Sequence, residues 1–120
     1  MAARDAQRQP LSLIVLVVDH FKLYNDTLGH AAGDLALQQV AAALQSRALR
    51  TTDLAARSGG EEFVLLVAET TLDTAAALAE SIRALVESLH LPHPRLSTSE
   101  WLTVSMGVAS IVPNQFDRIE

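Results

Sequence analysis

Residues 53–67, DLAARSGGEEFVLLV, contain two short, mainly apolar segments on either side of a pair of glycines. Each segment has the length of one strand, and Gly59 and Gly60 supply the conformational freedom that a tight turn between two strands requires. This stretch therefore predicts a β-hairpin. Two glutamates follow the glycines directly, so carboxylates are expected beside the turn.

Strand and helix patterns precede this hairpin. Residues 11–18, LSLIVLVV, form a β-branched apolar run that is too short for a typical helix and predicts a central strand. Asp19 can cap a short helix that stops at Gly29, and Gly33-Asp34 is expected to open a second helix. The core face of that second helix is marked by apolar residues at helical spacing: Leu37, Val40, Ala41, Leu44 and Ala48.

The patterns after the hairpin complete the fold. Residues 70–73 resemble a capping box and open a third helix, and residues 102–111 form a last strand. The order strand, helix, helix, hairpin, helix, strand predicts an α+β fold with a ferredoxin-like core, in which helices cover an antiparallel-dominated sheet. Proteins of many functions share that architecture, so the fold by itself indicates none of them.

Composition narrows the class of protein. The 120 residues are 49% hydrophobic and include no cysteine, which fits one globular domain and excludes disulfides and thiolate metal sites. A net charge of -5 argues against binding to a nucleic acid polymer, which needs clustered Lys and Arg. No run is long enough for a membrane span or a signal peptide, so the expected location is the cytoplasm, without membrane contact from this segment.

A second polar segment, residues 19–34 (DHFKLYNDTLGHAAGD), follows the first strand and would neighbour the glycine turn if that strand pairs beside the hairpin. Glycines let a backbone approach a phosphate, and an adjacent carboxylate can hold a hard divalent cation. The alternative is an ordinary hairpin with solvated glutamates. Under that alternative Phe21 belongs to the core, Lys22 is a solvated charge, Asn25 sits in a turn and Asp34 caps a helix.

Three motifs together resemble the GGDEF family of diguanylate cyclases, and most closely the cyclase half of response-regulator diguanylate cyclases. In chain order and at the family's separations they read VVDHFKLYNDTLGHAAGD, RTTDLAARSGGEEF and LTVSMGVAS. Residues 11–113 are accordingly interpreted as a partial GGDEF domain, residues 1–10 as an N-terminal lead and residues 114–120 as a truncated tail.

The resemblance implies a nucleotidyl-cyclase palm that converts two GTP into cyclic-di-GMP in bacterial second-messenger signalling. Two such domains face each other as a homodimer, each holding one GTP, with Mg²⁺ or Mn²⁺ as the cofactor. It implies that Glu61 and Glu62 are catalytic, and that Glu61 and the backbone of Val18 bind the metal. Nucleotide binding falls on the residues that match the family's phosphate and guanine motifs: Phe21, Lys22, Asn25, Asp34, Gly59 and Gly60.

The chain departs from the family at the metal site. Val17 stands where the family carries a metal-binding aspartate, and valine cannot coordinate Mg²⁺. Asp19 is an alternative ligand, displaced by about 6 to 7 Å along the strand. The family also continues beyond residue 120 with cationic residues that contact the triphosphate. We therefore expect weak or absent cyclase activity in this form, with an active, dimerised full-length enzyme as the alternative.

A third site is expected just before the hairpin. Arg50 and Asp53 match the family's RxxD inhibitory site, which binds cyclic-di-GMP, and Arg57 is expected to add a second guanidinium nearby. The bound dinucleotide has two guanine faces, so ligand-promoted dimers are expected. An exposed ion pair is the alternative for Arg50 and Asp53. The family's further arginine on the third helix falls at Ser81. His20, His30, His90 and His93 are assigned no role in the chemistry.

Overall fold

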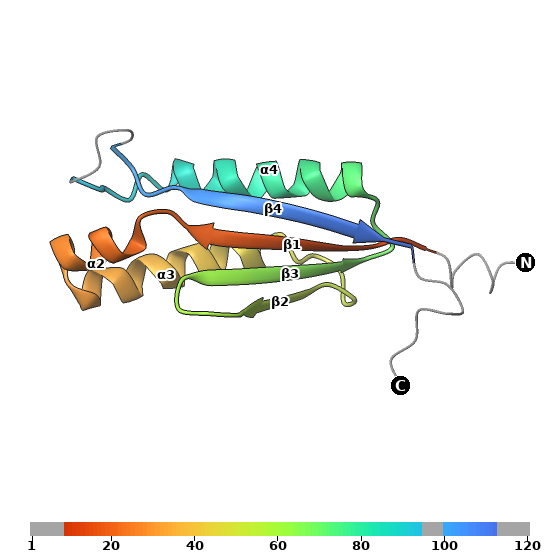
Figure 1. Ribbon diagram of the computed structural model, residues 1–120, viewed down its shortest axis with the longest axis horizontal. Coiled ribbons are helices and arrows are strands. Elements are labelled where there is room, and N and C mark those ends of the chain that lie inside the picture. Colours follow the sequence, from red (N-terminus) through yellow and green to blue (C-terminus); the bar gives the residue numbers. More distant parts are fainter. Residues whose placement is uncertain (1–8, 95–99, 113–120) are drawn as a thin grey trace, which may run out of the picture.

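A computed structural model describes residues 9–94 and 100–112, and it confirms the α+β fold with a ferredoxin-like strand order (Figure 1). The four strands lie in the order β2-β3-β1-β4, and every neighbouring pair is antiparallel. The elements in chain order are β1 (Leu11–Val18), α2 (Phe21–Leu28), α3 (His30–Gln45), β2 (Leu54–Arg57), β3 (Glu62–Ala68), α4 (Leu72–Ser88) and β4 (Val104–Ile111).

The central strand β1 pairs with β3 on one side and β4 on the other, as its apolar sequence predicts. Its side chains alternate between the two faces of the sheet, so Ile14 and Leu16 are buried while Leu13 and Val17 are partly exposed. This register places Val17 directly opposite Glu62 of β3. The two polar motifs are therefore neighbours in space, as predicted.

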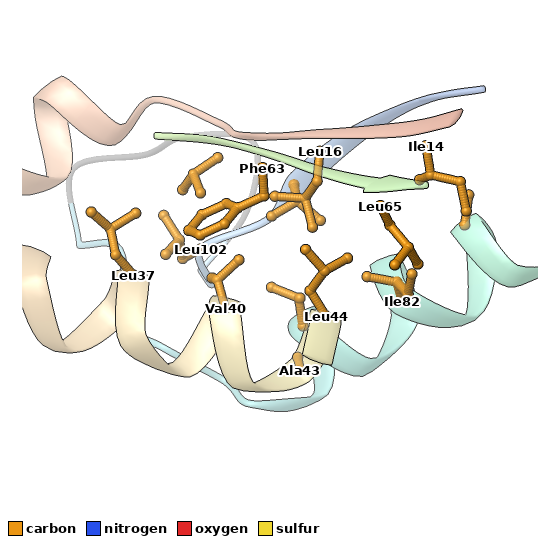
Figure 2. Packing of buried hydrophobic residues seen from close by; sticks show 14 of the residues in the cluster. Ile14, Leu16, Leu37, Val40, Ala43, Leu44, Phe63, Leu65, Ile82 and Leu102 are labelled. Atoms are coloured by element: carbon orange, nitrogen blue, oxygen red, sulfur yellow. The ribbon is translucent and has the colours of Figure 1, made fainter. Parts of the chain in front are cut away.

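Helices α3 and α4 cover one face of this sheet, and the core lies between them and the strands (Figure 2). From α3 the predicted stripe supplies Leu37, Val40 and Leu44, all at most 5% exposed. The other face carries partly exposed apolar residues, and no helix of residues 9–94 or 100–112 covers it. No helix in this part of the chain is long and apolar enough to cross a membrane.

Three predicted element starts are wrong. The residue before helix α2 is His20, which has a left-handed backbone (φ 52°) and does not cap the helix with its side chain. Asp19 is therefore not the N-cap, and its carboxylate accepts a hydrogen bond from Thr103 instead. Helix α3 begins at His30, directly after Gly29 (φ 94°), so Gly33-Asp34 lies inside it. Helix α4 starts one residue later than the predicted capping box: its N-cap is Thr71, whose hydroxyl accepts a hydrogen bond from the Thr74 N–H (3.3 Å).

Candidate functional site

The end of β1 and the glycine turn form the candidate catalytic edge of the sheet. The N–H of Val18 donates to the carbonyl of Glu61 (3.0 Å), and Val17 pairs with Glu62. Figure 1 shows the β2–β3 turn at the same end of the sheet as α2. The fold thus brings both glutamates to the segment that precedes the predicted phosphate-binding helix.

Arg57 braces the glycine turn. Its Nε donates to the carbonyl of Gly59 (3.0 Å), and its terminal nitrogen donates to the carbonyl of Gly60. Arg57 is thereby held at the turn, at the opposite end of β2 from Asp53. The four residues of β2 separate the two backbone positions by about 13 Å. These contacts hold the Arg57 guanidinium at the turn, so its part in the Arg50–Asp53 site stays a prediction.

The metal-binding part of this edge is incomplete. Glu61 and Glu62 are present, but the position opposite Glu62 is the apolar Val17. Both carboxylate oxygens of Asp19 accept hydroxyl hydrogen bonds, from Thr103 (2.8 Å) and Ser105 (2.6 Å) on the β4 side of β1. Within residues 9–94 and 100–112, no group of three acidic, histidine or cysteine side chains could hold a metal ion. The donor set therefore fits Mg²⁺ poorly, and both carboxylate oxygens of Asp19 are already engaged by hydroxyls.

Replacing Asp19 by alanine should cost about 2 kcal/mol of unfolding free energy, because two charge-assisted hydrogen bonds between distant segments are lost. Urea denaturation measures this, and Mg²⁺ should stabilise the variant no less than the wild type. If Mg²⁺ stabilises the wild type but not Asp19→Ala, and the variant is otherwise as stable as the wild type, Asp19 is a metal ligand instead. Asp26→Ala is the matched control, since the Asp26 carboxylate forms an exposed ion pair with Lys22 on the same helix.

An open pocket of about 490 Å³ lies between α3 and β2. It is lined by Asp34, from the predicted guanine motif, and by Arg57 at the end of β2. Its remaining lining is mainly apolar and amide: Leu37, Gln38, Ala41, Leu44, Gln45, Ala55, Ala56 and Phe63. A carboxylate, a guanidinium and an apolar wall are suited to a base and a phosphate. The other predicted nucleotide residues do not line this pocket.

Those other residues lie on α2 and at the turn. The Phe21 side chain is buried and stacks on Tyr24, with ring centroids 6.2 Å apart, so only the backbone of Phe21 remains for a phosphate. Lys22 is exposed and pairs with Asp26 (2.9 Å). Asn25 packs against α3, and its buried carbonyl oxygen Oδ1 has no hydrogen-bond partner among residues 9–94 and 100–112. The predicted set is thus split between α2, the α3 pocket and the turn.

The RxxD pair forms an ion pair in the structure, with 3.2 Å between the Arg50 guanidinium and the Asp53 carboxylate. The same guanidinium donates to the carbonyl of Ala68 and to the hydroxyl of Thr70 (2.5 and 2.7 Å). The side chain of Arg50 is 45% exposed, whereas that of Asp53 is 4% exposed. Arg50 therefore joins the segment before β2 to the turn after β3, and it also offers a cation to solvent.

His93 is a residue near the site that sequence reasoning missed. It is 1% exposed, its ring is nearly perpendicular to that of Tyr24 with centroids 5.3 Å apart, and its Nε2 lies 3.2 Å from the carbonyl oxygen of His20. Burial also raises the pKa of the Tyr24 phenol, which stays neutral at physiological pH. A lone histidine between two prolines has no periodic pattern, so no sequence signal marks its burial.

Known proteins share this fold and sequence. The family model described as "Diguanylate cyclase, GGDEF domain" matches residues 1–120. Diguanylate cyclase A of Treponema denticola is 40% identical over 104 residues, which cover 87% of this chain and 27% of that protein. Diguanylate cyclase DgcM of Escherichia coli K12 is 47% identical over 102 residues, covering 84% and 23%. The chain thus spans about a quarter of these relatives' length.

Solved structures of GGDEF domains share the fold of this chain. The active GGEEF domain of a Vibrio cholerae diguanylate cyclase superposes with a TM-score of 0.71 at 37% identity, covering 92% of this chain and 67% of that one. The GGDEF domain of DgcB from Caulobacter crescentus, in complex with c-di-GMP, gives 0.77 at 35% identity, covering 93% and 65%. This chain belongs to the GGDEF domain family of the diguanylate cyclases.

Proposed function

We propose that this GGDEF domain binds guanine nucleotides in the cytoplasm but performs the cyclase reaction poorly. The observation that carries the proposal is the edge of the sheet beside the glycine turn. There Val17 lies opposite Glu62, and Asp19 is engaged by hydroxyls on the other side of β1. The domain keeps nucleotide-binding groups while one position of the metal site is apolar.

GTP is proposed to bind between α2, α3 and the glycine turn. Asp34 can accept hydrogen bonds from N1 and N2 of guanine, and the amide of Asn25 can donate to O6. The backbone at the start of α2, where N–H groups point outward, and the bare backbone of Gly59 and Gly60 would meet the phosphates. These groups differ in kind, which suits a ligand with a base at one end and phosphates at the other.

Mg²⁺ or Mn²⁺, when bound, would neutralise phosphate charge and polarise the α-phosphate. Glu61, Glu62 and the backbone of Val18 are the groups of this chain that would hold it. An incomplete oxygen set binds a hard cation less tightly and places it less accurately. Slow chemistry with retained nucleotide binding is the expected result.

Cyclic-di-GMP is proposed to bind at Arg50 and Asp53, and a dinucleotide with two guanine faces could bridge two domains into a homodimer. Support comes from the exposed part of the Arg50 guanidinium and from the c-di-GMP complex of the similar DgcB domain. The Asp53 carboxylate is buried and already paired with Arg50. Ligand binding therefore requires this ion pair to rearrange or leaves Asp53 to orient Arg50.

The alternative is an active cyclase when dimerised in a longer protein. It is favoured by one observation, that both glutamates of the turn are present beside the end of β1. Incubating the domain with GTP and Mg²⁺ or Mn²⁺, followed by chromatography of the nucleotides, separates the two proposals. Rapid formation of cyclic-di-GMP supports the alternative, and unchanged GTP supports the binding role.

The domain should bind GTP about tenfold more tightly than ATP, because adenine presents an amino donor where guanine presents the O6 acceptor. Titration calorimetry without turnover measures both affinities. Asp34→Ala should reduce the preference, and the control Asp26→Ala should not, since Asp26 lies on α2 and pairs with exposed Lys22. Equal affinities for GTP and ATP in the wild type would remove the guanine-reader assignment.

A further inference from the structure

Helices α2 and α3 touch at Gly33. A β-carbon at this position would lie 1.7 Å from Oδ1 and 2.8 Å from Cγ of Asn25, and 3.2 Å from the ring of Phe21. The backbone of Gly33 is helical, and its N–H donates to the carbonyl of Gly29 (3.1 Å), so the glycine is not needed for an unusual dihedral angle. What requires a glycine here is the position of the Asn25 amide.

The contact also orients that amide. Its carbonyl oxygen Oδ1 lies against Gly33 and is buried without a partner in the described part of the chain. The amide nitrogen is therefore the group left to meet a ligand. An N–H donor suits the O6 acceptor of guanine and rejects the 6-amino donor of adenine.

We propose that Gly33 is a positioning residue that sets the orientation of the Asn25 amide and thereby the guanine preference of the domain. The inference rests on the proposed role of Asn25 as a guanine reader. Alanine is the better helix former, so glycine in α3 is unfavourable for the helix itself. An added methyl group would meet the flexible end of the Asn25 side chain first, so the amide would move while the fold remains.

The test is titration calorimetry of Gly33→Ala with GTP, ATP and ITP in the absence of turnover. The melting temperature should stay within a few degrees of wild type. GTP affinity should fall about tenfold, as expected for one lost hydrogen bond, and the preference over ATP should shrink to the part that Asp34 supplies. The preference of GTP over ITP depends on the 2-amino group and should persist. Gly107→Ala is the control, because nothing lies within 4 Å of a β-carbon there.

A double-variant cycle separates positioning from packing. Asn25→Ala should cause the same loss of GTP affinity, and Gly33→Ala should add no further loss in that background. If Asn25→Ala reduces the preference while Gly33→Ala binds GTP like wild type, Gly33 has no positioning role although the proposed function stands. If Asn25→Ala leaves the preference intact, the guanine-reader assignment itself fails.

One outcome remains for a poorly folded variant. Should Gly33→Ala melt far below wild type, the double variant decides, because Asn25→Ala removes the atoms 1.7 and 2.8 Å away but leaves Phe21 in place. Recovery of the melting temperature in the double variant would support the contact with Asn25. Failure to recover would assign the glycine to packing against Phe21 and overturn the proposal.

Discussion

Replacing Val17 by aspartate is expected to give the domain a Mg²⁺-dependent stability that the wild type lacks. The new carboxylate would stand directly opposite Glu62, where two like charges on paired strands repel each other without a cation. With Mg²⁺ at 100 times its dissociation constant, binding to the folded state would add about 3 kcal/mol, or about 10 °C in melting temperature. Thermal denaturation with and without Mg²⁺ measures the difference.

Leu13→Asp is the matched control for this substitution. Leu13 lies on the same face of β1 with nearly the same exposure (36% against 37% for Val17), but it pairs with Leu66 and Ala109 instead of an acid. Mg²⁺ should not rescue it. An equal Mg²⁺ response in both variants, or a full response in the wild type, would show that Val17 is not the missing ligand position.

The same variant tests the chemistry. With GTP and Mg²⁺, Val17→Asp should form cyclic-di-GMP at least about a hundredfold faster than the wild type, because a well-placed cation contributes several kcal/mol to such a reaction. Chromatography of the nucleotides gives both rates. Wild-type turnover equal to that of Val17→Asp would overturn the proposal of a poorly active domain.

Replacing Arg50 by alanine is expected to weaken cyclic-di-GMP binding at least about tenfold, since charge-assisted hydrogen bonds to phosphate or guanine are lost. Arg50→Lys should bind with intermediate affinity, because it keeps the charge and loses the planar fork. Titration calorimetry gives the affinities, and light scattering shows whether the ligand promotes dimers. Binding should weaken with salt, as expected for an exposed cation.

Two further variants distinguish ligand binding by Arg50 from its structural contacts. Thr70→Val removes a hydrogen bond from the guanidinium without removing the charge, so it should lower stability but spare most of the affinity. Arg83→Ala removes an arginine that pairs with Glu80 and Glu87 on its own helix, and it should change neither the stability nor the affinity much. If Arg50→Ala binds cyclic-di-GMP like wild type, the ligand occupies another site, most simply the pocket beside Asp34.

Much of the fold was predictable because its signals are local. The β-branched run of residues 11–18, the glycine turn of the hairpin and the helical spacing of residues 37–44 each depend on neighbours in the chain. Hydrophobic alternation then places β1 at the centre of the sheet, and the structure confirms it. Family membership was predictable for the same reason, since three ordered motifs are visible in one dimension.

Helix starts and side-chain partners were not predictable, because a side chain that could cap a nearby helix can instead bond a residue distant in the sequence. Asp19 can cap a helix beside it, yet its carboxylate binds hydroxyls more than 80 residues away. Gly29 lets α3 begin earlier than Gly33-Asp34 suggests. His93 reaches the carbonyl of His20 across 73 residues.

Sequence patterns alone indicate the family, the order of the elements and the kinds of side chain gathered at the hairpin edge, including Val17 where the family carries a carboxylate. Which of those groups are already engaged by other residues becomes visible in the folded chain. The tertiary structure assigns Asp19 to β4, Arg57 to the glycine turn and Arg50 to the β3–α4 turn, and it sets the Asn25 amide against Gly33. Hydrogen bonds and close contacts between distant segments exist only after the chain has folded, and no local pattern encodes their competition for the same side chain.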